Sequence, residues 1–210
     1  MNGKAPEYEV WKDTFNLAPR TKGGFIQIRN LKMRIGLIRH LPVNYPFLNG
    51  LVSQSEMLKW FEEYNAAPVI EKNLQSVGSW NLCYSSELSR AKTTAAFCFK
   101  GDIVYSPFLN EPFPSPLFKR DIRLPFILWA LVIRLAILFN HSSQLLGKSI
   151  VEERIKGLLK DILINKDSNV LIISHAFIME SMSKLLIKEG FRGKHLNMPQ
   201  HGVLYLYTKD

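Results

Sequence analysis

A short apolar run at residues 33–38 ends directly in Arg39 and His40, and this junction constrains the chain more than any other feature. Such a run is typical of a buried strand, which the chain leaves at the polar pair. Because open α/β sheets bind ligands just beyond the carboxyl ends of their strands, a cation and an imidazole at this point suit an anionic ligand. For the dipeptide alone, an ordinary surface pair is the alternative, so the interpretation depends on what else reaches the same edge.

Strand and helix signals alternate through the rest of the chain. Ser53 followed by Glu56 predicts the start of a helix, because the two side chains can cap its first turn. The alternation favours the α/β class with a layered, mostly parallel sheet. The expected strands are residues 34–38, 81–84, 102–105, 169–174 and 202–207, and the expected helices are residues 53–64, 68–76, 88–99, 120–140, 149–165 and 177–189.

Polar side chains follow the ends of several expected strands. Arg39 and His40 follow the first strand, and Arg90 follows the second. His175 ends the fourth strand, while Glu111 lies in a proline-rich loop after the third. The carboxyl ends of parallel strands share one edge of a sheet, so these side chains can converge on a single crevice.

Four segments resemble motifs of the histidine phosphatase superfamily, which is also called the phosphoglycerate mutase-like family. They are residues 35–40, 84–95, 109–111 and 170–175, and their order and spacing cover most of residues 33–207. The resemblance implies a three-layer α/β/α sandwich of the phosphoglycerate mutase-like type for residues 33–210. Residues 1–32 are then an N-terminal extension of unknown role, and residues 118–146 form either a helical lid or a core helix.

The resemblance also implies a role for each matching residue. His40 is the nucleophile that takes a phosphoryl group, because a neutral imidazole can attack phosphorus near neutral pH. Arg39, Arg90 and His175 surround the phosphate, and planar guanidinium groups match two of its oxygens at once. Glu111 is expected to protonate the leaving oxygen and later to activate water.

The alternative for Glu111 is a loop carboxylate paired with Lys119 or Arg120. No metal ion or other cofactor is expected, since the chain lacks the carboxylate clusters that bind Mg²⁺ in other phosphate enzymes. Basic side chains in the lid segment, Arg120, Arg123 and Arg134, are candidates for contact with a second anionic group.

The chain departs from the family pattern in three places. Leu41 follows His40 and Ala176 follows His175, where the family commonly has glycine, and residues 112–116 replace the segment that usually follows the loop glutamate. These differences affect the identity of the substrate more than the mechanism. Asn44 is a candidate phosphate contact, although its offset from His40 differs from that of the family's asparagine.

Composition limits the remaining function classes. The 210 residues carry a formal net charge of +9, but the basic residues are scattered, so no nucleic-acid partner is expected. The longest apolar stretch, the 16 residues 124–139, is interrupted by Arg134 and falls short of the roughly 20 residues of a membrane span. Cys83 and Cys98 are expected to be reduced packing residues. We therefore expect a cytoplasmic protein, and its oligomeric state stays open.

The function that fits these expectations is a metal-independent phosphatase that hydrolyses small phosphomonoesters through a phosphohistidine intermediate, similar to a histidine acid phosphatase. Two enzymatic alternatives use the same pocket: a phosphoglycerate mutase-like phosphotransferase and a protein phosphohistidine phosphatase. A non-catalytic phosphate-binding protein is the third alternative.

Overall fold

The computed structural model describes residues 33–71, 77–164 and 169–210. The expected extension at residues 1–32 lies outside these residues and stays a prediction. So does most of the helix expected at residues 68–76, and its described part, residues 68–71, is not helical. There Val69 instead forms a β-bridge with Val43.

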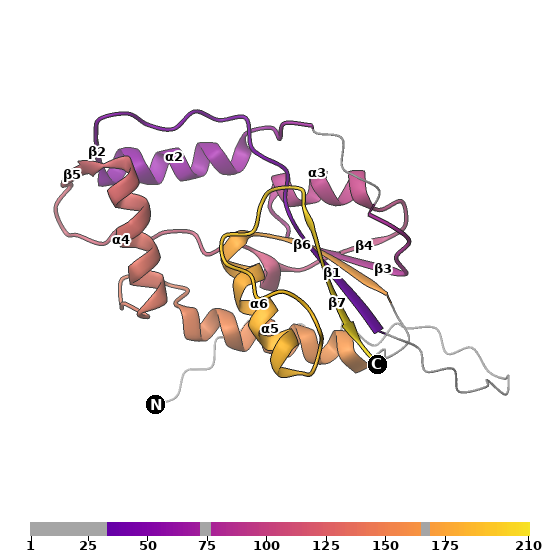
Figure 1. Ribbon diagram of the computed structural model, residues 1–210. Helices are drawn as coiled ribbons and strands as arrows, with labels where there is room; N and C mark the ends of the chain where they lie inside the picture. Colours follow the sequence, from indigo (N-terminus) through magenta and orange to yellow (C-terminus); the bar gives the residue numbers. More distant parts are fainter. Residues whose placement is uncertain (1–32, 72–76, 165–168) are drawn as a thin grey trace, which may run out of the picture. The chain divides into compact units, whose positions relative to one another are not determined.

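A five-stranded sheet forms the centre of the fold, with the strand order β4-β3-β6-β1-β7 (Figure 1). The strands β1 (Met33–Arg39), β3 (Leu82–Ser85), β4 (Ile103–Tyr105) and β6 (Val170–Ser174) are parallel, and β7 (Leu204–Lys209) runs antiparallel to β1. The expectation of a mostly parallel sheet is confirmed. Arg39 pairs with Ser174 in the β1 to β6 register, so the next residues, His40 and His175, leave the same edge of the sheet together.

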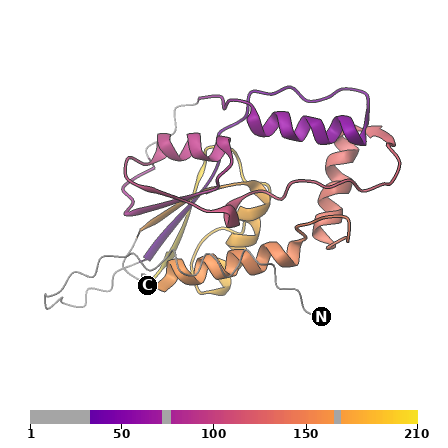
Figure 2. The same cartoon turned by 180° about the vertical axis from the view of Figure 1, so that it is seen from behind.

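Helices cover both faces of this sheet, which confirms the three-layer sandwich (Figures 1 and 2). The helices α5 (Lys148–Ile164) and α6 (Ala176–Lys188) pack on one face, where Ile35 and Leu37 belong to the same apolar cluster. The helix α3 (Ser89–Cys98) packs on the other face, against a cluster that contains Ile38 and Leu171. Because neither face meets water, β1 and β6 are apolar almost throughout.

Two further helices lie beside the carboxyl end of the sheet rather than on its faces (Figure 1). The helix α2 (Gln54–Ala66) begins after Ser53, and the predicted capping box is confirmed. The Glu56 N–H donates to Ser53 Oγ at 3.2 Å, and the Ser53 N–H donates to Glu56 Oε2 at 2.7 Å. The helix α4 (Phe126–Leu138) packs against α2 through a separate apolar cluster that includes Trp60 and Trp129.

The single helix expected at residues 120–140 is wrong in its first part. Arg123–Pro125 form the short strand β5, which pairs antiparallel with β2 (Leu51–Ser53). Pro125 disfavours the helical conformation at Leu124, so the helix begins only at Phe126. Part of the proline-rich loop forms the 3₁₀ turn η1 (Pro107–Leu109).

Two expectations from composition can be compared with the structure: the state of the cysteines and the length of the apolar helices. Cys83 and Cys98 are free thiols, and burial raises the pKa of Cys83 to about 12, which suits a packing residue. No helix in residues 33–71, 77–164 and 169–210 is long and apolar enough to cross a membrane.

The packing of α5 on the sheet is tested by two isoleucines of the same helix. Ile155 is 0% exposed and Ile150 is 45% exposed. We expect Ile155→Ala to lower the free energy of unfolding by about 2–5 kcal/mol, because it leaves a cavity in the core. Ile150→Ala is the matched control, with a change within about 0.5 kcal/mol. Chemical denaturation measures both, and equal losses would contradict the assigned face.

Candidate active site

His40 is held in one tautomer by its surroundings. Its backbone N–H donates to the Ser174 carbonyl at 3.0 Å, which continues the β1 to β6 pairing, and the ring is buried. Nδ1 lies 2.7 Å from the Leu41 carbonyl oxygen, which can only accept, so Nδ1 carries the hydrogen. Nε2 therefore keeps its lone pair and accepts a hydrogen bond from Arg90 Nε at 3.2 Å. Burial, followed by the charge of Arg90, holds the pKa of His40 well below its ordinary value.

The position after His40, where the family commonly has glycine, is occupied by Leu41 and does not require glycine. Leu41 is buried, and its φ is not positive, so its backbone does not need the left-handed conformation that glycine permits. The Leu41 N–H donates to Thr94 Oγ1 at 2.9 Å, and Thr94 Oγ1 donates to the Arg90 carbonyl at 2.7 Å. This connection ties the loop after β1 to α3, the helix that carries Arg90.

Arg90, which is buried, and Arg39, which is partly buried, flank His40. Arg39 Nη1 donates to the Pro199 carbonyl at 3.0 Å, while Arg39 Nε is buried without a partner among the described residues. Arg90 Nη1 donates to Asn65 Oδ1, and its guanidinium lies 5.2 Å from the centroid of the Tyr64 ring. Burial lowers the pKa of both arginines. Two desolvated cations so close together favour the arrival of an anion.

His175 is oriented by a chain of hydrogen bonds. Asn110 Oδ1 accepts from the Glu87 N–H at 2.8 Å and from Ser86 Oγ at 2.7 Å, so the Ser86 hydrogen is committed to Asn110. Ser86 Oγ must then accept from His175 Nε2, which lies 2.8 Å away. The other ring nitrogen, Nδ1, is buried without a partner in the described part of the chain. The two rings of His175 and His40 have centroids 5.0 Å apart.

The charge of His175 depends on what the site holds. Burial, followed by the nearby Arg90, keeps its pKa well below the ordinary value, so the ring is neutral and Nδ1 has a lone pair. A bound dianion reverses the sign of the local field and favours a proton on Nδ1. His175 can then donate from Nδ1 to an oxygen of that anion.

Glu111 is a partly buried carboxyl group at the same site. Its Oε1 accepts a long hydrogen bond of 3.4 Å from the Phe177 N–H, and its Oε2 has no partner among the described residues. Burial raises the pKa of Glu111, while Arg90 and Arg39 oppose that rise. A carboxyl group in this state can hold a proton and deliver it to a leaving oxygen.

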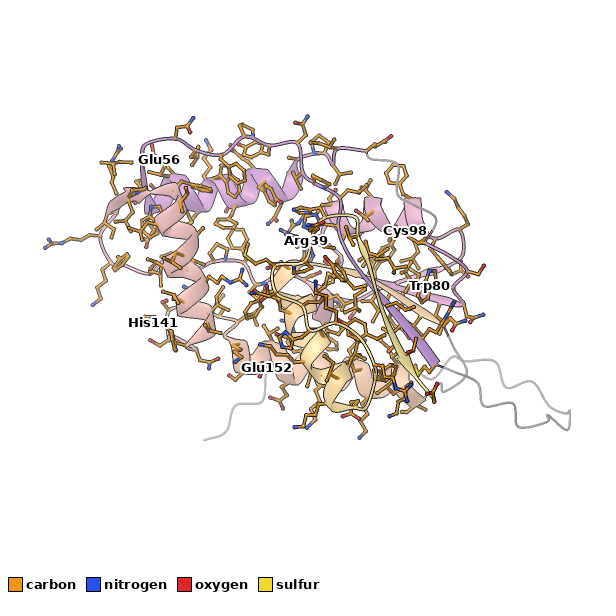
Figure 3. All side chains as sticks on the ribbon, in the orientation of Figure 1. Arg39, Glu56, Trp80, Cys98, His141 and Glu152 are labelled. Atoms are coloured by element: carbon orange, nitrogen blue, oxygen red, sulfur yellow. The ribbon has the colours of Figure 1, made fainter. Side chains whose placement is uncertain are left out.

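One cavity of about 290 Å³ brings these groups together. We call one part of its lining the polar end: Arg39, His40, Arg90, Glu111, His175 and His201. Figure 3 shows the labelled Arg39 at the end of the sheet near α2, with His141 away from it beyond α4. Five of the six predicted site residues thus meet at one cavity. The sixth, Asn44, is exposed and does not line it, and its backbone N–H donates to the Pro68 carbonyl at 2.8 Å.

Sequence reasoning missed several residues that contact this site. Tyr64 and Asn65 reach Arg90 from α2, and Asn110 positions Ser86. His201, which was not among the candidate site residues, hydrogen-bonds through Nδ1 to the His40 carbonyl at 2.7 Å. Two signals were available in the sequence: His201 lies beside the expected final strand, and Asn110 lies in the matching segment at residues 109–111.

The hydrogen bond between Ser86 and His175 can be tested by ligand binding. We expect Ser86→Ala to weaken the binding of inorganic phosphate about 5- to 100-fold, because His175 Nε2 loses its acceptor and the ring loses its orientation. Calorimetric titration measures the affinity, and chemical denaturation checks that the fold persists. Unchanged phosphate affinity in a folded Ser86→Ala protein would contradict the assigned role.

Comparison with known proteins places the fold. No family model and no curated protein matches the sequence. Among solved structures, phosphoglycerate mutase from Bacillus anthracis matches with a TM-score of 0.54 at 13% identity, covering 85% of this chain and 88% of the other. Phosphoserine phosphatase from Entamoeba histolytica, in complex with 3-phosphoglyceric acid, matches with a TM-score of 0.51 at 14% identity, covering 83% and 89%. Mycobacterial hydrolase 1 matches with a TM-score of 0.51 at 16% identity, covering 84% and 91%.

Sequence identities of 13–16% show similarity of fold only, so an inference about chemistry must rest on the residues of the site. The matched mutase and phosphatase are members of the superfamily that the four sequence motifs resemble. The chain therefore has the phosphoglycerate mutase-like fold.

Proposed function

We propose that this chain is a phosphatase that hydrolyses phosphomonoesters through a phosphohistidine formed at His40 Nε2. One observation carries the proposal. Arg39 Nε, Glu111 Oε2 and His175 Nδ1 are buried polar atoms without a partner in the described residues, and all three residues line the cavity that holds His40. Buried polar atoms without partners are rare in folded proteins, and a phosphate ester offers each of these three a partner.

The first step transfers the phosphoryl group to the protein. When the ester binds, Arg90 Nε donates to a non-bridging oxygen instead of to His40 Nε2, which frees the Nε2 lone pair to attack phosphorus. Arg39 and His175 donate hydrogen bonds to the other non-bridging oxygens. The ester P–O bond breaks, and its electron pair stays on the leaving oxygen, which takes the proton of Glu111. The Leu41 carbonyl, which accepts from Nδ1, stabilises the positive charge that develops on the ring.

The second step returns the protein to its starting state. The Glu111 carboxylate takes a proton from a water molecule, whose oxygen attacks phosphorus. The P–N bond breaks, its electron pair returns to Nε2, and inorganic phosphate leaves. A single carboxyl group thus serves first as acid and then as base, which suits a pKa above the ordinary value for glutamate.

The covalent step is tested by trapping the intermediate. We expect rapid quenching of a reaction with ³²P-labelled phosphomonoester to leave acid-labile, base-stable radioactivity on the protein, also in the presence of a chelator. His40→Ala removes both the labelled protein and the hydrolysis. His195→Ala is the matched control, because His195 is exposed and lies outside the cavity lining, and it retains both. Full activity of His40→Ala would reject the proposal.

The pH dependence of kcat/KM follows from two shifted groups. His40 must be neutral, so the rate falls as the pH drops through its pKa, which lies below 6.5 because of burial and Arg90. Glu111 must be protonated, so the rate falls as the pH rises through its pKa, which burial places above 4.5.

We therefore expect a bell-shaped profile in which Glu111→Gln abolishes the alkaline limb. The same variant lowers the rate about 10²- to 10⁴-fold for an alkyl phosphate. The loss is smaller for p-nitrophenyl phosphate, whose leaving group needs little help from a proton. Steady-state rates across pH for both substrates check this, and an alkaline limb that persists in Glu111→Gln would contradict the role of Glu111.

A further inference from the structure

Beyond the polar end, six aromatic rings line the cavity, together with Asn65, Pro112, Pro114, Ala130 and Ala176. These rings are Phe47, Trp60, Phe61, Tyr64, Phe113 and Phe126, and we call them the aromatic end. They come from α2, from the start of α4 and from the loops beside them, which lie at the carboxyl end of the sheet (Figure 1). Any group esterified to a phosphate at the polar end must lie against this wall.

The aromatic end is rigid where it meets the rest of the fold. Trp60 is buried, its Nε1 donates to the Pro46 carbonyl at 2.7 Å, and its ring lies 4.6 Å from that of Phe126 by centroids. Phe47 stacks on Trp60 at 5.8 Å with an interplanar angle of 18°, and Phe113 packs edge-on against Phe61 at 6.3 Å. The wall therefore exists before a ligand arrives, which lowers the entropic cost of binding one.

Two of these rings still have apolar surface to bury. Phe47 is 71% exposed and Phe113 is 42% exposed, although both line the cavity. Exposed aromatic surface inside a concave site is typical of a binding wall, and a flat apolar group between the rings would remove it from water.

The aromatic end has no cationic side chain among its described lining residues that could bind a second negative charge on a substrate. Outside the polar end, the described residues of the lining include no lysine or arginine. The candidate Arg134 is bound by Glu180, with Nη2 2.8 Å from each carboxylate oxygen. Arg120 and Arg123 are exposed and do not line the cavity. A substrate carboxylate would thus lose its water against aromatic rings without gaining a cationic partner.

We infer that the preferred substrate is the phosphomonoester of an alcohol with an aromatic or similarly flat apolar group, and not a small phosphorylated acid. The inference rests on the proposed function for the turnover of that ester. The aromatic end binds the alcohol part, and the polar end binds the phosphoryl group.

The experiment compares substrates whose leaving groups have similar intrinsic reactivity. All are alkyl phosphates: 2-phenylethyl phosphate, glycerol phosphate, O-phosphoserine and 3-phosphoglycerate. We expect kcat/KM for 2-phenylethyl phosphate to exceed the other three by about tenfold or more, since a buried aromatic ring contributes a transfer term of that order. A value for O-phosphoserine or 3-phosphoglycerate that equals or exceeds it would overturn the inference and leave the proposed function intact.

Variants locate the effect in the aromatic end. Phe47→Ala and Phe113→Ala should each lower kcat/KM for 2-phenylethyl phosphate about 5- to 20-fold and leave glycerol phosphate nearly unchanged. Phe97→Ala is the matched control, because Phe97 is 43% exposed but lies on α3 outside the lining, and it should change neither. Equal losses on both substrates in the Phe47 and Phe113 variants would overturn the inference.

A binding measurement separates this inference from the proposed function. The non-hydrolysable 2-phenylethylphosphonate should bind more tightly than 3-phosphonopropionate in calorimetric titration, and Phe47→Ala should remove most of the difference. If no phosphate ester is hydrolysed but this preference holds, the proposed function fails and the assignment of the aromatic end stands. If the carboxylated phosphonate binds as tightly, the assignment fails.

Discussion

The parallel pairing of β1 with β6 is the constraint on which the site depends. Arg39 and Ser174 face each other in the register, and the hydrogen bond from the His40 N–H to the Ser174 carbonyl extends the pairing by one residue. Both histidines therefore leave the sheet side by side, although 134 residues separate them in the chain (175 − 40 − 1). A slip of one residue would turn His40 to the opposite face of the sheet, because side chains alternate along a strand. The apolar residues on both faces of β1 and β6, which pack against α3 on one side and α5 with α6 on the other, make such a slip costly.

The site holds ionisable side chains that are largely removed from water. Two arginines and two histidines are largely removed from water, and the pKa of each is lowered mainly by that burial. Neighbouring groups reduce the free-energy cost of this burial but do not remove it. Asn65 and Tyr64 contact Arg90, and Ser86 holds His175. His175 Nδ1 and Arg39 Nε nevertheless stay without a partner among the described residues. Such a site is less stable when empty than when an anion fills it, which is the preorganisation that electrostatic catalysis requires.

Local signals in the sequence were enough for most of the fold. The capping residues Ser53 and Glu56, and the apolar strands that end at Arg39 and Ser174, are determined by neighbours in the chain, and their positions were predicted within a residue or two. The strand β5 was missed because its hydrogen bonds go to β2, about 70 residues earlier in the chain (123 − 53 and 125 − 51). The same reason explains Asn65, Asn110 and His201, whose roles come from contacts made through space. Asn44 was a candidate by its nearness to His40 in the chain, yet it is exposed and lies outside the cavity lining, beside the bridge between Val43 and Val69.

Four of the six rings of the aromatic end belong to or pack against an apolar cluster that is separate from the two clusters of the sheet: Trp60, Phe61, Tyr64 and Phe126. The helices α2 and α4 contribute most of that cluster, and the outer side of α4 is exposed at Ile127, Leu131 and Leu135. The polar end instead depends on the paired ends of β1 and β6. The two ends of the cavity thus rest on different parts of the fold, so a substitution in the cluster of α2 and α4 can reshape one end while His40 and His175 keep their places at the other.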